Sequence, residues 1–151
     1  LPAIGAGAAH ARRSVADVAL VVPVFVAVGT RDEDVERQRA AIRALIAFYG
    51  STRTYRAVFE LHGWPDLPSQ LHEMQSRGDS DGMTAVVTDE ILDTVSVTAS
   101  WDGLAPLLRD RYEGIAARVM PYSVSAGWRS NPEIAERWRA VATELHASDG
   151  V

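Results

Sequence analysis

The sequence predicts an α/β protein with parallel strands. A β-branched apolar run at residues 18–28 is followed directly by an amphipathic helical pattern at 30–50, and strand and helix patterns then alternate. A strand that is apolar throughout is typical of a parallel sheet, in which both faces are buried. Because 47% of the 151 residues are hydrophobic, the chain has apolar material for one core, and we interpret 1–151 as a single domain.

The first half of the chain predicts a helix, a strand and a second helix. Small residues at 2–13 form the first helix, and the strand at 18–28 contains Pro23. Because proline cannot donate to a strand ladder, we expect Pro23 at an edge position or a bulge. Thr30 and Glu33 have the spacing of a capping box, which predicts that the second helix starts there. Gly50 is expected to end this helix.

The segment after the aromatic residues predicts two more helices and a strand. One helix is expected at 66–75, ended by Gly78, and another at 80–95. The β-branched segment 94–100 predicts a short strand.

The last third of the chain repeats the alternation. Asp102 is expected to cap a helix, in which Pro106 is tolerated only near the first turn. A third strand is expected at 117–122. Asn131 and Pro132 then have the favoured order of a cap and a first helical residue. The core face of this final helix is expected to consist of Ile134, Trp138, Val141 and Leu145.

Composition excludes several classes of function. The formal net charge of −5 argues against nucleic acid as a partner, since phosphate binding needs a basic surface. All 15 basic residues are arginine, which excludes a Schiff-base lysine and a Walker-type phosphate lysine. The chain has no cysteine, which is consistent with a cytoplasmic protein. The apolar run is too short to span a bilayer, so no membrane partner is expected.

Two patterns imitate metal sites without completing them. Residues 79–90 begin like a calcium loop, but Met83 stands at a ligand position and Thr84 replaces the turn glycine. His72 and Glu73 begin a zinc-protease pattern, but Ser76 occupies the place of the second histidine. We therefore expect no metal site.

The aromatic side chains are concentrated at 46–64, the stretch "IAFYGSTRTYRAVFELHGW". Tyr49, Tyr55, His62 and Trp64 each combine an apolar body with a polar tip, which suits a partly hydrated pocket. His62 has a side chain whose ordinary pKa suits proton transfer. The alternative is a structural one, in which this stretch is an insertion packed over the sheet. The sequence leaves both interpretations open.

Three segments carry a resemblance to a known family. Residues 21–64, "DEILDTVSVTAS" at 89–100 and "RYEGIAARVMPY" at 111–122 resemble the C-terminal part of the luciferase-like monooxygenase superfamily. Within it, the spacing of "FYGST", a tyrosine and "HGW" is similar to that of actinobacterial oxidoreductases that use the deazaflavin coenzyme F-420. Gly103 and Pro106 depart from the family, which usually has helix formers there.

The resemblance implies a partial TIM (β/α)8 barrel, namely its C-terminal half. It implies hydride transfer, or oxygen insertion with FMN as the alternative coenzyme, on a small organic substrate. The coenzyme contacts in such relatives come largely from the first six units, so this chain alone is not expected to bind coenzyme F-420 or FMN and no catalytic residue is assigned. What carries over is a pocket wall for coenzyme or substrate that comprises Tyr49, Ser51, Thr52, Tyr55, His62 and Trp64.

Two further expectations follow from the half-barrel interpretation. Half a barrel leaves strand edges unpaired and an apolar inner face uncovered, which predicts a homodimer or a higher homo-oligomer. The alternative function is that of a catalytically inactive, truncated relative that serves as a self-associating binding module.

Overall fold

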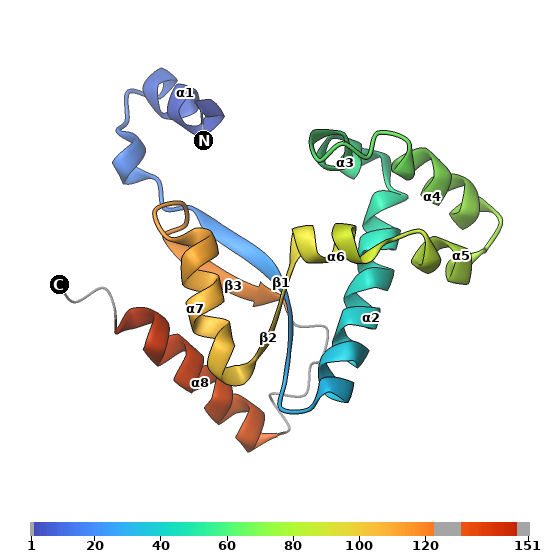
Figure 1. Ribbon diagram of the computed structural model, residues 1–151. Helices are drawn as coiled ribbons and strands as arrows, with labels where there is room; N and C mark the ends of the chain where they lie inside the picture. The colour runs from blue at the N-terminus through green and yellow to red at the C-terminus, as the bar shows by residue number, and fades with distance from the viewer. Residues whose placement is uncertain (1, 123–130, 148–151) are drawn as a thin grey trace.

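A three-stranded parallel sheet forms the centre of the computed structural model, which describes residues 2–122 and 131–147 (Figure 1). Its strands are β1 (Val21–Gly29), β2 (Ser96–Ser100) and β3 (Arg118–Tyr122), in the order β2-β1-β3. Both pairings are parallel. The predicted α/β class and its parallel sheet are therefore confirmed.

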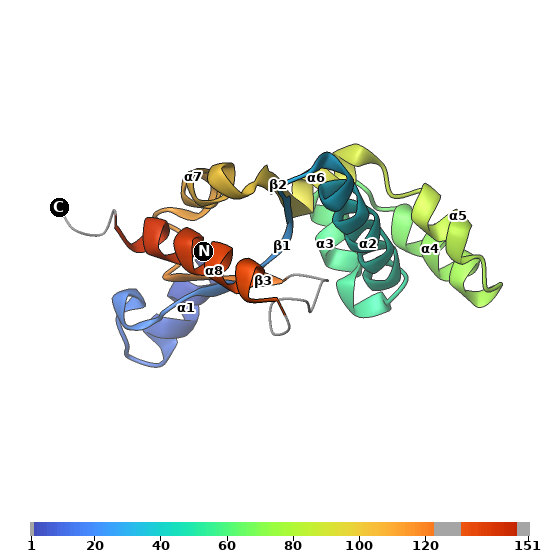
Figure 2. The same cartoon turned by 90° about the horizontal axis from the view of Figure 1, so that it is seen from below.

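Helices cover both faces of the sheet, and each face has its own apolar cluster. Helix α2 (Asp32–Gly50) lies on one side, and α7 (Trp101–Tyr112) and α8 (Pro132–His146) lie on the other (Figure 2). Because side chains alternate along a strand, β1 contributes Phe25 and Ala27 to the α2 side, while its valines at 24, 26 and 28 pack with α7 and α8.

This arrangement does not confirm the expected half-barrel. In a closed barrel the helices form an outer ring and strand side chains fill the interior. Here α7 and α8 occupy the second face of the sheet, with Leu104 and Leu108 completely buried against β1. The apolar face that was expected to be uncovered is therefore covered by the chain itself.

Pro23 lies in the central strand β1, but at a position paired on one side only, which corresponds locally to the expected edge position. Strand β1 lies between the other two, but its two ladders overlap only at Phe25. Strand β3 pairs with residues 21–25, whereas β2 pairs only from Phe25 to Gly29. One side of β1 is consequently unpaired at Pro23, and the missing N–H is tolerated there.

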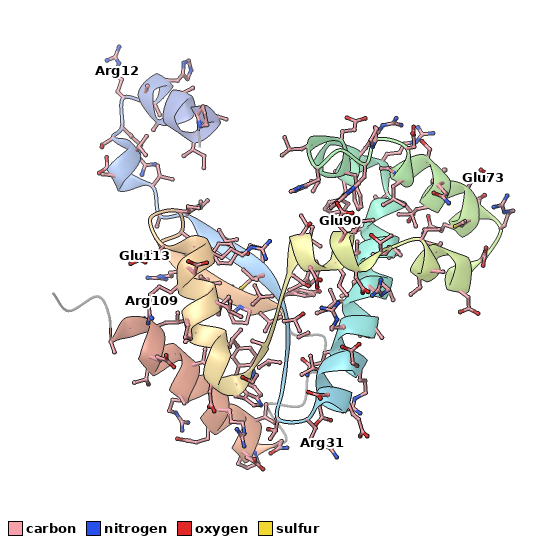
Figure 3. The ribbon with its side chains drawn as sticks, viewed as in Figure 1. Arg12, Arg31, Glu73, Glu90, Arg109 and Glu113 are labelled. Atoms are coloured by element: carbon pink, nitrogen blue, oxygen red, sulfur yellow. The ribbon has the colours of Figure 1, made fainter. Side chains whose placement is uncertain are left out.

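Helix α2 starts differently from the prediction but ends at Gly50, as predicted. Its cap is Arg31, which makes no side-chain cap hydrogen bond, so the capping box of Thr30 and Glu33 is wrong. Arg31 instead donates from Nε to Asp34 Oδ2 at 2.9 Å, at the outer start of the helix (Figure 3). Gly50 does not end the helix by a left-handed turn. It is the last helical residue and is buried beneath Phe59 and Leu71.

Four short helices form an insertion between α2 and β2, and they pack on the same side of the sheet as α2. They are α3 (Arg56–Leu61), α4 (Leu67–Ser76), α5 (Ser80–Ala85) and α6 (Asp89–Val95), and a single 3₁₀ turn, η2 (Arg53–Tyr55), precedes them. The helix predicted at 66–75 is confirmed. The single helix predicted at 80–95 is wrong, because Thr88 caps α6 and breaks it from α5.

The cap of α7 is Ser100, whose hydroxyl accepts a hydrogen bond from the Gly103 N–H, so the expected cap Asp102 is wrong. Since the helix begins at Trp101, Pro106 lies inside it, beyond the first turn, on an exposed position. Helix α8 is confirmed: the Asn131 side chain accepts from the Glu133 N–H at 3.0 Å. The predicted core face of α8 packs in the cluster of α7.

The N-terminal helix α1 (Pro2–His10) is shorter than the predicted 2–13 and is followed by a 3₁₀ turn, η1 (Val15–Asp17). It lies at the outer end of the sheet, beyond the start of β1 (Figure 1). Within the described part of the chain, no helix is both long and apolar enough to cross a bilayer.

The free edge of β2 is covered by an arginine. Arg111 of α7 donates to the carbonyl oxygens of Ser96, at 2.9 Å, and of Thr94. Cationic side chains on an edge oppose pairing with another chain. At the opposite edge, β3 contains Pro121, which cannot donate to a further strand. Each edge therefore carries one side chain that disfavours strand addition.

Candidate functional site

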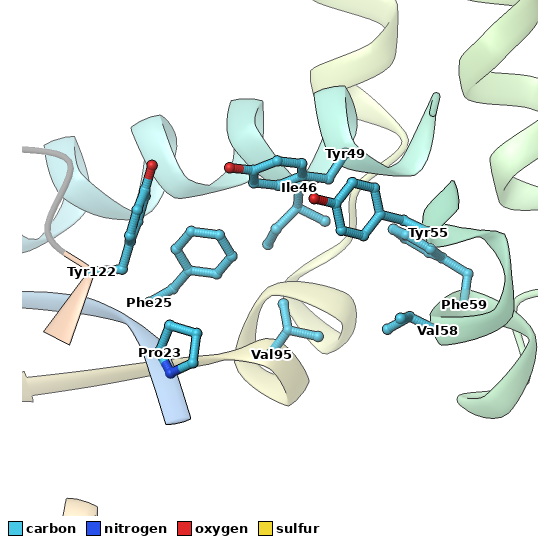
Figure 4. A pocket seen from close by; sticks show the side chains of 9 residues that line it. All are labelled: Pro23, Phe25, Ile46, Tyr49, Tyr55, Val58, Phe59, Val95 and Tyr122. Atoms are coloured by element: carbon cyan, nitrogen blue, oxygen red, sulfur yellow. The ribbon is translucent and has the colours of Figure 1, made fainter. Parts of the chain in front are cut away.

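An aromatic pocket lies between the sheet, the end of α2 and the insertion (Figure 4). Its volume is about 300 Å³, and none of its lining residues is charged. We call it the aromatic pocket; its wall consists of Pro23, Phe25, Ile46, Tyr49, Tyr55, Val58, Phe59, Val95 and Tyr122.

Elements far apart in the sequence supply this wall. The register of β1 and β3 places Phe25 opposite Tyr122, and their rings meet edge to face with centroids 5.4 Å apart. The ring centroid of Tyr49, on α2, lies 6.3 Å from that of Phe25. The ring centroid of Tyr55, in η2, lies 4.9 Å from that of Tyr49. Tilted and edge-to-face contacts are the favoured geometries of aromatic pairs. The rings are thus held in one continuous cluster.

The tyrosine hydroxyl groups leave the pocket uncharged. The neighbouring Tyr122 hydroxyl is the main cause that raises the pKa of Tyr49, and the nearby Tyr55 adds to it. Since a tyrosine hydroxyl already titrates near pH 10 in solution, Tyr49 remains protonated at neutral pH. The polar atoms of the wall are therefore neutral hydroxyls, which donate or accept hydrogen bonds without attracting ions.

The predicted pocket wall is brought together only in part. Tyr49 and Tyr55 line the aromatic pocket, and their rings contact each other. Ser51 is buried, and its hydroxyl donates to the Phe48 carbonyl oxygen at 2.6 Å. The Thr52 hydroxyl donates to the same carbonyl oxygen at 3.3 Å. These two hydroxyls end the helix rather than face the pocket.

His62 and Trp64 follow directly after α3 and lie outside the aromatic pocket. Their rings stack with centroids 5.4 Å apart, and Trp64 also contacts Phe59 at 6.4 Å. His62 is exposed, whereas Trp64 is half-buried. The structural interpretation of the aromatic stretch, an insertion packed over the sheet, describes this part of it only coarsely, because the insertion packs against α2.

Sequence reasoning missed the strand residues of the pocket. Phe25 was visible as the one aromatic residue in the apolar run, and Tyr122 ends the predicted third strand. No local pattern shows that these residues face each other, because their contact depends on the parallel register of β1 with β3. Val58 and Val95 carry no signal that distinguishes them from core residues.

A second groove, with polar side chains, runs along β2, but it has fewer groups available to bind a ligand. Its arginines are already occupied: Arg39 donates to Asp93 at 2.6 Å and to Thr98 at 2.8 Å, and Arg111 covers the strand edge. Over residues 2–122 and 131–147, no group of three His, Asp or Glu side chains is placed to hold a metal ion. The aromatic pocket is thus the best-formed candidate site.

The comparison with protein families identifies the class of protein. The model of the luciferase-like monooxygenase family matches residues 1–118, which is most of the chain and includes β1, α2, the insertion, β2 and α7. The chain belongs to the luciferase-like monooxygenase family. The match ends where β3 begins.

Curated relatives give no further function. Uncharacterized proteins of Mycobacterium bovis and Mycobacterium tuberculosis are 37% identical to the chain over 126 residues, which is 83% of this chain. That alignment covers 37% of each relative, so the chain spans little more than a third of their length. No solved structure matches the chain significantly.

Proposed function

We propose that the chain is the C-terminal portion of an oxidoreductase or monooxygenase that uses coenzyme F-420, or FMN as the alternative, on a small organic substrate. The family match over residues 1–118 is the observation that carries this proposal. In the complete enzyme this segment would contribute units of a TIM barrel. The coenzyme would supply the redox chemistry, and the protein would supply binding and orientation.

The aromatic pocket does not fit the whole coenzyme. Both coenzymes carry phosphate, which proteins hold with backbone N–H groups at helix N-termini or with cations. The aromatic pocket has no charged residue and a volume of only about 300 Å³. The coenzyme site is therefore assigned to chain beyond these residues, and the reaction steps belong with it. Of the predicted wall, Tyr49 and Tyr55 are retained as binding residues.

A second candidate is a catalytically inactive binding module that associates with copies of itself. Exposed apolar side chains beside the aromatic pocket favour it: Phe48, Val58 and Leu61 are 51%, 47% and 83% exposed. Apolar residues that gather around one opening are typical of interaction surfaces. With Arg111 and Pro121 on the sheet edges, a homodimer would form through this patch rather than through strand pairing.

The natural protein purified from its source cell separates the two candidates. We expect coenzyme F-420 or FMN to copurify with it, as seen by absorbance and by mass spectrometry after denaturation. Sedimentation of the same sample measures its association. A natural polypeptide that contains no coenzyme, is not reconstituted by either one and sediments as a homo-oligomer would contradict the oxidoreductase and support the binding module.

A further inference from the structure

The position of the aromatic pocket separates it from the place where a coenzyme is expected. In parallel α/β proteins, catalytic ligands bind beyond the carboxyl ends of the strands. The carboxyl ends of β1 and β2, Gly29 and Ser100, pair with each other, whereas the pocket contains Phe25, early in β1. The short strand β3 reaches only to this level, with its last residue Tyr122 opposite Phe25. Helix α2 runs back along the sheet, so its end at Tyr49 lies away from the carboxyl end of β1 (Figure 1).

The chemistry of the wall selects uncharged ligands. All lining side chains are apolar or aromatic, and the only polar side-chain atoms among them are the hydroxyls of Tyr49, Tyr55 and Tyr122. An ion would lose part of its hydration in such a site without gaining an opposite charge, which disfavours its binding. A neutral molecule with one hydroxyl or carbonyl group loses little, because a tyrosine hydroxyl can replace its bond to water.

The volume of the pocket and the geometry of its rings narrow the class of ligand further. A volume of about 300 Å³ holds about ten groups of the size of a water molecule, which corresponds to one or two fused rings. Phe25, Tyr49 and Tyr55 present tilted rings around this space (Figure 4), and such rings favour an aromatic partner by edge-to-face or offset contacts.

We propose that the aromatic pocket is a binding site for an uncharged aromatic molecule of one or two fused rings, separate from the coenzyme site. Phe25 and Tyr122 form its floor on the sheet, Tyr49 and Tyr55 hold one side, and Val58 stands at its rim. The proposal goes beyond the oxidoreductase function, because it requires neither the coenzyme nor turnover.

The experiment is a titration of the chain with 2-naphthol, a neutral two-ring probe, and with 2-naphthoate, which is an anion at neutral pH. Calorimetry is expected to show saturable one-to-one binding of 2-naphthol with a dissociation constant of about 100 µM or tighter, and at least tenfold weaker binding of 2-naphthoate. Equal affinity for the two probes, or no saturable binding of 2-naphthol, would overturn the proposal.

Two variants of α3 place the same new charge inside and outside the pocket. Val58→Arg puts a guanidinium at the rim and is expected to weaken 2-naphthol binding at least tenfold. Leu61→Arg lies on the same helix, outside the wall and 83% exposed, and is expected to leave binding unchanged within twofold. Circular dichroism checks that both fold, which is expected because both positions are largely exposed.

The exposed apolar side chains of Phe48, Val58 and Leu61 could instead be covered by a second copy of the chain, which would then compete with the small molecule. Sedimentation with and without saturating 2-naphthol measures this competition. A dimer that forms only when Val58 and Leu61 are intact, and that 2-naphthol neither binds nor dissociates, would overturn the small-molecule site in favour of an interface.

Discussion

Replacing Val26 by Arg is expected to unfold the chain. Val26 is 0% exposed and packs between β2 and α7, with Val97 as its partner in the ladder. Among the described residues no acidic side chain is buried, so the guanidinium would be buried without a partner. The expected loss is about 4 kcal/mol or more of the free energy of unfolding, which is comparable to the whole stability of many domains.

Thermal and urea unfolding followed by circular dichroism measure this loss. The matched control is Val15→Arg, the same change at a valine that is 52% exposed, and it is expected to shift the free energy of unfolding by less than about 0.5 kcal/mol. A cooperative transition of Val26→Arg near that of the parent chain would show that α7 and α8 do not cover this face of the sheet.

Replacing Gly50 by Ala is expected to destabilise the chain although alanine is the better helix former. A Cβ atom on Gly50 would lie 2.5 Å from Leu71 Cδ1 and 2.8 Å from Phe59 Cζ. Both neighbours are buried and have little room to move. We expect a net loss of about 1–3 kcal/mol, because the overlap exceeds the helix-propensity gain of about 1 kcal/mol.

The control for Gly50 is the same change at Gly7, which also lies in a helix. A Cβ atom there meets nothing within 4 Å, so Gly7→Ala is expected to be neutral or stabilising by up to about 1 kcal/mol. Unfolding curves of the two variants give the comparison. A Gly50→Ala variant as stable as Gly7→Ala would mean that α3 and α4 do not pack on the end of α2.

Local patterns predicted the strands and the last helix because each depends on neighbouring residues. The unbroken apolar run predicted β1, and Asn131 with Pro132 predicted the start of α8. Gly50 was correctly predicted as the end of α2, but for another physical reason: it has no left-handed conformation and instead makes room for Phe59 and Leu71. Close packing between segments distant in sequence leaves no local trace.

The candidate site likewise contains residues that a local pattern predicts and residues that only the packing of distant segments brings together. Tyr49 and Tyr55 could be predicted since they belong to one aromatic stretch, whereas Phe25 and Tyr122 are joined only by the register of β1 and β3. His62 and Trp64 share the amphipathic character of the other rings, but they follow a short helix and stack on each other outside the pocket. The second layer of helices could not be predicted either, because it depends on β3 pairing beside β1 rather than beside β2.

Titration of the isolated chain with coenzyme F-420 and with FMN tests most directly the claim that this segment carries an aromatic pocket but no coenzyme site. Coenzyme fluorescence and calorimetry are the two readouts. We expect no saturable binding of either coenzyme, or only weak binding with a dissociation constant well above the micromolar range, because the aromatic pocket has no charged residue to hold a phosphate. Saturable binding with a dissociation constant of about 10 µM or tighter would contradict it.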